Sequence, residues 1–135
     1  MLSRRKFGTC AICAVVGLAA TKVESQAQTA GAPKRTLLQK TEFPDKYATI
    51  LMMIELEPNF DIARHTHPGV ESSYVLEGGL ELMVQGQPAK SYKAGEGFQV
   101  PPHTPHSGKN GDKPTKLIIT YVVEADKPIA SPAPA

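Results

Sequence analysis

Tryptophan is absent from this chain of 135 residues, cysteine occurs only twice, and neither sign of charge dominates. With 15 basic and 13 acidic residues, the sequence lacks the strong positive balance that favours binding to nucleic acids or anionic membranes. It also lacks a long apolar run: the longest covers residues 9–20, too short to cross about 30 Å of hydrocarbon. We therefore expect no nucleic-acid partner, no stable membrane anchor and, from the length, one domain.

The N-terminus carries the three parts of an export signal. Ser3-Arg4-Arg5-Lys6-Phe7 is a twin-arginine pattern, the apolar run 9–20 follows it, and Ser25-Gln26-Ala27 offers a small-x-small cleavage site. We predict a twin-arginine signal peptide over residues 1–27, with cleavage near Ala27 or a few residues later near Ala30. The protein would then be periplasmic or secreted. A single membrane anchor is the alternative, which the short apolar run disfavours.

The two cysteines, Cys10 and Cys13, both lie inside this signal, so their C-x-x-C spacing does not predict a redox site. The mature chain would have neither a disulfide nor a thiolate metal ligand. Cleavage would also remove four basic residues and one acidic residue, changing the formal net charge of +2 to about −1. Because twin-arginine substrates cross the membrane folded, any metal would be acquired in the cytosol.

The remaining sequence is rich in turn residues and in alternating apolar patterns. Twelve prolines and eleven glycines favour turns over long helices. Residues 46–57 alternate with period two, which predicts a strand lining a core. Further strands are expected at residues 71–76, 80–85, 89–93, 98–100 and 115–124. This spacing predicts an all-β barrel or sandwich. We place the domain at 36–125, after a flexible lead-in at 28–35 and before a Pro/Ala-rich, disordered tail at 126–135.

The chain has four histidines, and all of them fall in two short segments. His65 and His67 are two residues apart, so both rings point to the same side of an extended strand. Glu71 has the same parity and returns to that side if the strand resumes after Pro68-Gly69. A fourth ligand must come from elsewhere, and His106 is the natural candidate.

Three neutral imidazoles and one carboxylate suit one divalent transition metal, of which Fe, Mn, Ni, Cu and Zn all remain open. Calcium and magnesium prefer an all-oxygen shell. Four protein ligands in an octahedral arrangement leave two positions for water, substrate or dioxygen. His103 could act on substrate as an acid or base, or point outward from its Pro-rich loop.

These two segments resemble the two motifs of the cupin superfamily. In each segment one residue stands where the family usually has glycine, Asn59 in the first and His103 in the second. Asparagine adopts a turn with positive φ more easily than most residues. The matching patterns are Asn59-(x5)-His65-x-His67-(x3)-Glu71-(x6)-Gly78 and Gly95-(x5)-Pro101-x-His103-(x2)-His106-(x3)-Asn110.

The resemblance implies a small jelly-roll-like β-barrel with a metal held near its centre by His65, His67, Glu71 and His106. The similarity to quercetin-dioxygenase-type cupins further implies a metal-dependent oxidoreductase that acts on a small organic substrate, with Glu71 as ligand and base. The resemblance to cupins in general also implies a homodimer. The fold alone leaves the reaction open. A non-catalytic periplasmic protein that binds a metal or small ligand is the alternative. A sugar isomerase or epimerase is less favoured, because Arg64 and Lys90 alone do not suggest a sugar-phosphate pocket.

Overall fold

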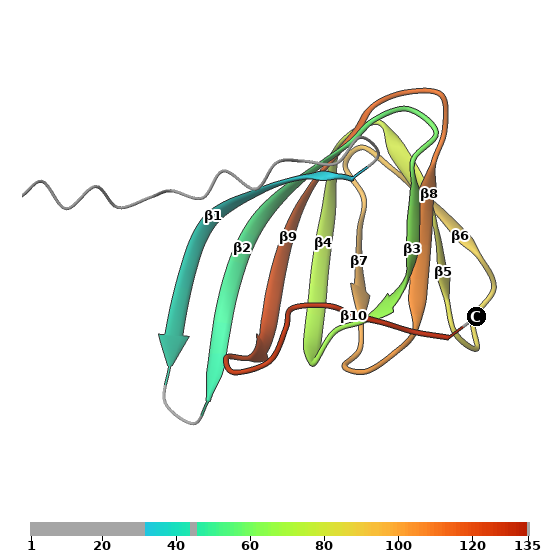
Figure 1. Cartoon of the computed structure of the whole chain (residues 1–135). Helices are drawn as coiled ribbons and strands as arrows, with labels where there is room; N and C mark the ends of the chain where they lie inside the picture. The colour runs from blue at the N-terminus through green and yellow to red at the C-terminus, as the bar shows by residue number, and fades with distance from the viewer. Residues whose placement is uncertain (1–31, 44–45, 135) are drawn as a thin grey trace, which may run out of the picture.

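The computed structural model describes residues 32–43 and 46–134, which form two five-stranded antiparallel sheets (Figure 1). One sheet has the strand order β1-β2-β9-β4-β7 and the other the order β10-β3-β8-β5-β6. The predicted signal peptide lies outside the described residues. The strands are β1 (Lys34–Phe43), β2 (Tyr47–Leu56), β3 (Asp61–Thr66), β4 (Gly69–Glu77), β5 (Gly79–Val84), β6 (Lys90–Lys93), β7 (Gly97–Val100), β8 (His106–Asn110), β9 (Thr115–Glu124) and β10 (Ser131–Pro132).

The predicted all-β barrel is confirmed, and its core follows the period-two patterns. In β2 and β9 the residues that face inward are buried, and those between them are mostly half-buried. These two strands pair without a break from Tyr47 opposite Glu124 to Leu56 opposite Thr115. Apolar residues on the inner faces of both sheets form a single cluster. The site described below lies inside this barrel, against that apolar interior.

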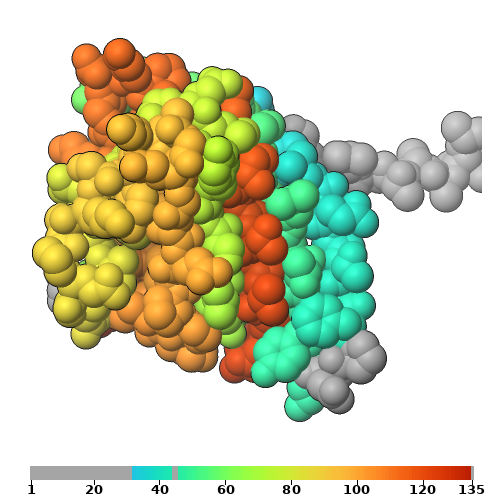
Figure 2. Space-filling view, turned by 180° about the vertical axis from the view of Figure 1, so that it is seen from behind, coloured from blue at the N-terminus to red at the C-terminus, as the bar shows by residue number. Residues whose placement is uncertain are grey.

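The outer face of the first sheet shows β1, β2, β9 and β4 as neighbouring bands (Figure 2). Several large apolar side chains remain exposed in these strands, among them Leu37, Tyr74 and Val122. No helix in the described part of the chain has the length and hydrophobicity needed to cross a membrane.

The C-terminal segment differs from the disordered tail that the sequence predicts over 126–135. Residues 126–134 follow a defined path, and β10 pairs antiparallel with β3. The Arg64 side chain donates from Nε to the Pro134 carbonyl at 2.9 Å, and the Ala133 N–H donates to the Arg64 carbonyl at 3.1 Å. A Pro/Ala-rich segment still has backbone carbonyls, and the free edge of β3 gives them partners. We call residues 126–134 the C-terminal strap.

The domain also begins earlier than the predicted boundary at residue 36. Strand β1 starts at Lys34 and pairs with β2, so the last two residues of the predicted lead-in belong to the first sheet. A long and mostly exposed edge strand therefore precedes the segments that carry the sequence motifs.

Candidate metal centre

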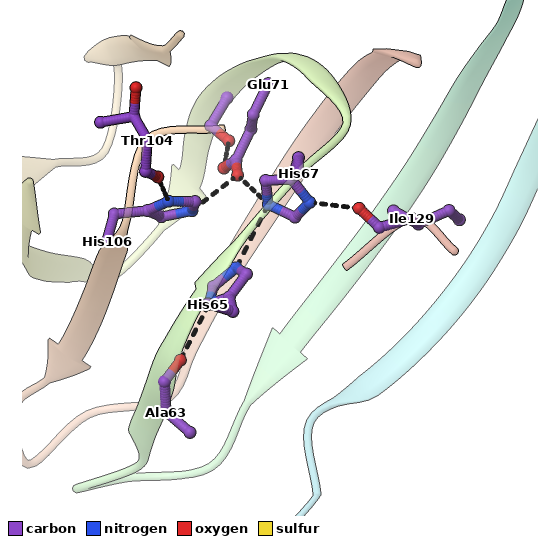
Figure 3. A network of polar contacts seen from close by, with 8 residues as sticks. Ala63, His65, His67, Glu71, Thr104, His106 and Ile129 are labelled. Carbon is purple, nitrogen blue, oxygen red and sulfur yellow. Dashed lines mark hydrogen bonds and ion pairs between the residues drawn. The ribbon is translucent and has the colours of Figure 1, made fainter. Parts of the chain in front are cut away.

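Four side chains from three strands and one loop meet inside the barrel (Figure 3). His65 lies in β3, His67 follows it, Glu71 lies in β4 and His106 opens β8. One potential ligand atom from each lies within 4.8 Å of those of the others. Three of the four residues are buried, and His65 is half-buried. The structure thus brings together the four residues that the sequence singles out as ligands.

The turn between His67 and Glu71 depends on a glycine. A β-carbon at Gly69 would overlap the Val122 carbonyl, because β4 starts in close contact with β9 there. Gly69 therefore allows β4 to begin against the β9 backbone, and Glu71, two residues further on the same face of β4, points toward His67. This local geometry explains how the predicted parity of the two residues is realised.

Each of the three histidines is oriented by a backbone carbonyl. His65 Nδ1 lies 2.8 Å from the Ala63 oxygen, and His106 Nδ1 lies 2.9 Å from the Thr104 oxygen. His67 Nδ1 lies 2.6 Å from the Ile129 oxygen of the C-terminal strap. A carbonyl can only accept a hydrogen bond, so each Nδ1 is the protonated nitrogen of its ring. In the neutral, ligating form of each ring the lone pair is then on Nε2, and all three Nε2 atoms point to the centre of the cluster.

The centre of the cluster is therefore made of acceptors that lack a donor. His65 Nε2 and His67 Nε2 are 3.2 Å apart, and Glu71 Oε2 lies 2.8 Å from His67 Nε2. His106 Nε2 lies 3.3 Å from the same oxygen without hydrogen-bond geometry, and it is buried without a partner among the described residues. Lone pairs at these separations repel one another unless a proton or a cation lies between them. Three imidazole nitrogens and one carboxylate oxygen fit a divalent transition metal.

The electrostatics keep the acidic ligand charged. Burial alone would raise the pKa of Glu71, but the close contacts of its carboxylate with His106 and His67 and the hydrogen bond from Ser73 outweigh it and hold the pKa well below the usual range. Ser73 Oγ donates to Glu71 Oε1 at 2.6 Å, which leaves Oε2 directed at the histidines. Burial also lowers the pKa of His65, which favours its neutral, ligating form.

The cluster opens into a cavity of about 390 Å³ whose walls are mostly apolar. Tyr121 lies on one wall, with its ring centroid 4.8 Å from that of His67. Burial, followed by the nearby Glu71 charge, raises the pKa of the Tyr121 hydroxyl, while the Arg35 charge opposes the rise. Tyr121 is therefore a neutral phenol that can donate a hydrogen bond. The aliphatic and aromatic walls are Met52, Ile54, Leu56, Phe60, Ile62, Leu80, Leu82, Phe98, Leu117, Ile119 and Ile129.

The structure does not bring His103 to this site. Its side chain is exposed, it does not line the cavity, and its backbone N–H donates to the His67 carbonyl at 2.8 Å. Its φ is +56°, and Asn59, the other residue at a usual glycine position, has φ of +57°. The positive φ expected for Asn59 is confirmed. At both positions the turn requires a left-handed backbone, which accounts for the glycine in the motif.

Three further residues at the site have no motif signal. Ser73 shares the inward face of β4 with Glu71, a parity that could have indicated it. Tyr121 falls in the strand expected at 115–124, but nothing in the sequence singles it out. The Ile129 carbonyl has no signal at all, because every residue has a carbonyl and only the fold selects one.

The sequence that forms this site matches a known protein family. Residues 52–121 match the cupin domain, and the chain belongs to that family. No curated protein matches the sequence closely enough to be counted as a relative.

Solved structures share the fold at low identity. An uncharacterized conserved protein with a double-stranded β-helix domain from Klebsiella pneumoniae is 21% identical, with a TM-score of 0.62 over 80% of this chain and 90% of that one. The polyketide cyclase RemF from Streptomyces resistomycificus is 22% identical, with a TM-score of 0.61 over 76% and 72%. The DMSP lyase DddQ from Ruegeria pomeroyi is 18% identical, with a TM-score of 0.59 over 63% of this chain and only 43% of the lyase. These similarities show the fold.

Proposed function

We propose that this protein is an exported, metal-dependent cupin enzyme that acts on a small organic molecule, with oxygenation of a phenolic or enolic substrate as its reaction. The observation that carries the proposal is the acceptor-only cluster of three imidazoles and a carboxylate, which faces an apolar cavity. The cavity has the size and the few polar groups typical of a small-molecule site. Two solved structures with this fold are of proteins named as enzymes, a cyclase and a lyase.

In this proposal the residues of the cavity have separate roles in metal binding, proton transfer and substrate binding. His65, His67, Glu71 and His106 would hold a divalent ion of Fe, Mn, Ni, Cu or Zn, which would supply Lewis-acid and, for the redox-active metals, electron-transfer chemistry. Glu71 would serve both as a ligand and as the base that accepts a proton from a substrate hydroxyl. Tyr121, whose ring lies beside that of His67, can donate a hydrogen bond to a substrate oxygen. The apolar walls exclude water and so strengthen these polar contacts.

Elemental analysis of protein purified without added metal tests the metal centre. We expect about one transition-metal ion per chain, since the site has one complete ligand set. His106→Ala should lower the content to near background. His103→Ala is the matched control, since it removes a histidine three positions away that is exposed and outside the cluster, and it should leave the metal content unchanged. Full occupancy in His106→Ala would remove this residue from the ligand set.

Oxygen uptake with phenolic and enolic compounds tests the reaction. An oxygenase loaded with its native metal consumes oxygen with at least one such compound, and His106→Ala should abolish that uptake. The alternative is a non-catalytic protein that binds a metal or a small ligand, and the largely apolar cavity wall suits this role as well. Stoichiometric metal without turnover of any compound would favour this alternative.

A further inference from the structure

One basic side chain lines the cavity without an acidic partner. Among the described residues, Arg35 is the only lysine or arginine that lines it. Arg35 is exposed at the cavity mouth and takes part in none of the ion pairs found in residues 32–43 and 46–134. A lone guanidinium at the mouth of an otherwise apolar cavity is available to a ligand.

The strand register explains why Arg35 faces inward. Arg35 lies opposite Ile54, a buried cavity residue on the inner face of β2. Its neighbour Lys34 lies opposite Glu55 and forms an ion pair with it on the other face. Adjacent residues of a strand point to opposite faces, so the two cations of β1 are separated by the sheet. Lys34 is neutralised on the outside, and Arg35 faces the barrel interior.

The other charges at the cavity do not neutralise Arg35. Glu71 belongs to the metal cluster. Asp61 is exposed at the rim, where Lys109 Nζ lies 3.8 Å from its carboxylate. The Arg35 charge nevertheless acts on Tyr121, which stands beside the cluster. An anion inside the cavity would therefore find Arg35 as its one strong cationic partner from the described residues.

The distance between Arg35 and the metal cluster indicates how long a ligand that contacts both must be. Glu71 pairs with Tyr121, and Tyr121 pairs with Ile50 of β2, so Glu71 and Ile50 lie at the same level of the sheet. Arg35 lies opposite Ile54, which is four residues further along β2. At about 3.3 Å per residue this is about 13 Å between backbone levels, part of which the arginine side chain spans. A ligand that touches both Arg35 and the metal needs several carbons between its ends, and the apolar walls lie along that path.

We propose that the substrate is an organic carboxylic acid, whose carboxylate binds Arg35 and whose apolar body directs the opposite end to the metal cluster. This deepens the function proposed above and rests on it, because both use the same cavity. The planar guanidinium fork matches a carboxylate in two parallel hydrogen bonds. Since Arg35 is the one lysine or arginine that lines the cavity among the described residues, its charge matches a carboxylate monoanion better than a phosphate dianion.

The test compares acids with their uncharged amides. Cinnamate, phenylpropionate and octanoate are each titrated against their own primary amide by calorimetry, with metal-free and with zinc-loaded protein. For at least one pair we expect the acid to bind roughly 10- to 100-fold more tightly, the range of a charge-assisted bidentate contact. Arg35→Gln should reduce this preference to about twofold or less in the metal-free protein while leaving amide binding unchanged.

Lys34→Gln is the matched control, because it removes the same charge from the adjacent residue on the outer face. It should keep the full preference for the acid. An acid preference that survives Arg35→Gln, an equal loss in Lys34→Gln, or no preference in any pair would overturn the proposal. Metal content is measured on every variant, so a failure of the metal centre is recognised separately from a failure of Arg35 as the carboxylate site.

Discussion

Shortening the C-terminal strap should weaken metal binding although it removes no ligand. A chain that ends at Pro128 lacks Ile129, whose carbonyl accepts the hydrogen bond from His67 Nδ1 at 2.6 Å. It also lacks β10 and its pairing with β3. Without this acceptor, the His67 ring can rotate or move its proton to Nε2, and either change withdraws the lone pair from the cluster.

The size of the effect follows from the role of that hydrogen bond. Loss of the group that orients a metal-binding histidine typically lowers metal affinity 10- to 100-fold. Tenfold corresponds to about 1.4 kcal/mol, so we expect a loss of about 1.4–2.8 kcal/mol in binding free energy. A chain that ends at Pro132 keeps Ile129 and both residues of β10 and loses, among the described contacts, the two hydrogen bonds of Ala133 and Pro134 with Arg64. Its affinity should stay close to that of the full chain.

Competition with a chelator of known zinc affinity measures the zinc affinity of the full chain and of the two shortened chains. Urea unfolding of the metal-free proteins separates a change in overall stability from a change at the site. Ile129→Gly is a further control, because it removes the side chain but keeps the carbonyl, and it should bind zinc more tightly than the chain ending at Pro128. Equal zinc affinity of the full chain and the chain ending at Pro128 would refute the orienting role of the strap.

Three other perturbations test the surrounding structure. Asn110→Ala removes a buried amide that accepts from one backbone N–H at 2.6 Å and donates to two carbonyls at 2.8 and 3.1 Å. The free energy of unfolding in urea should therefore fall by about 3 kcal/mol. A fall below about 0.5 kcal/mol would contradict a stabilising role for these hydrogen bonds. His103→Gly should leave zinc affinity unchanged and raise stability by up to about 1 kcal/mol, because glycine adopts positive φ without strain; a loss of zinc binding would instead give the side chain a role. The metal-free protein should lose stability on acidification. The lowered pKa values of His65 and Glu71 mean that the unfolded chain binds protons more readily, below about pH 6.5 for His65 and below about pH 4.5 for Glu71. Unfolding curves from pH 8 to pH 3 measure this, and Glu71→Gln should flatten the more acidic limb.

Three of the four candidate ligands could be predicted from their spacing along the chain. His65 and His67 share a strand face by their spacing, and Glu71 points to the same centre from β4, which Gly69 allows to start against β9. His106 depended on the motif resemblance, since it lies on a separate strand. Even there the alternation of β8, which buries His106, is consistent with an inward-facing residue.

The carbonyls that orient the histidines and the C-terminal strap could not be predicted from the sequence. Composition suggested disorder for the tail, because proline and alanine contribute little apolar surface and no side-chain hydrogen bonds. What holds the strap is backbone pairing at the free edge of β3, and composition does not register this. Arg35 had no signal either, since its inward direction follows from the register of β1 against β2. His103 drew attention as a titratable residue, whereas its position in the motif pointed to backbone conformation.

The three carbonyls that orient the histidines come from separate parts of the chain: Ala63 within β3, Thr104 in the loop before β8, and Ile129 in the strap. Only a chain that has folded to its last strand therefore has all three Nε2 lone pairs directed at one point. High-affinity metal binding should follow folding, and the bound ion in turn stabilises the folded state. If residues 1–27 act as a twin-arginine signal, folding is complete before export, so the metal supply of the cytosol determines which ion the site acquires. The same chain produced with a signal for export in the unfolded state should then carry a different metal, set by the affinity ranking among the ions outside the cytosol, and elemental analysis measures this.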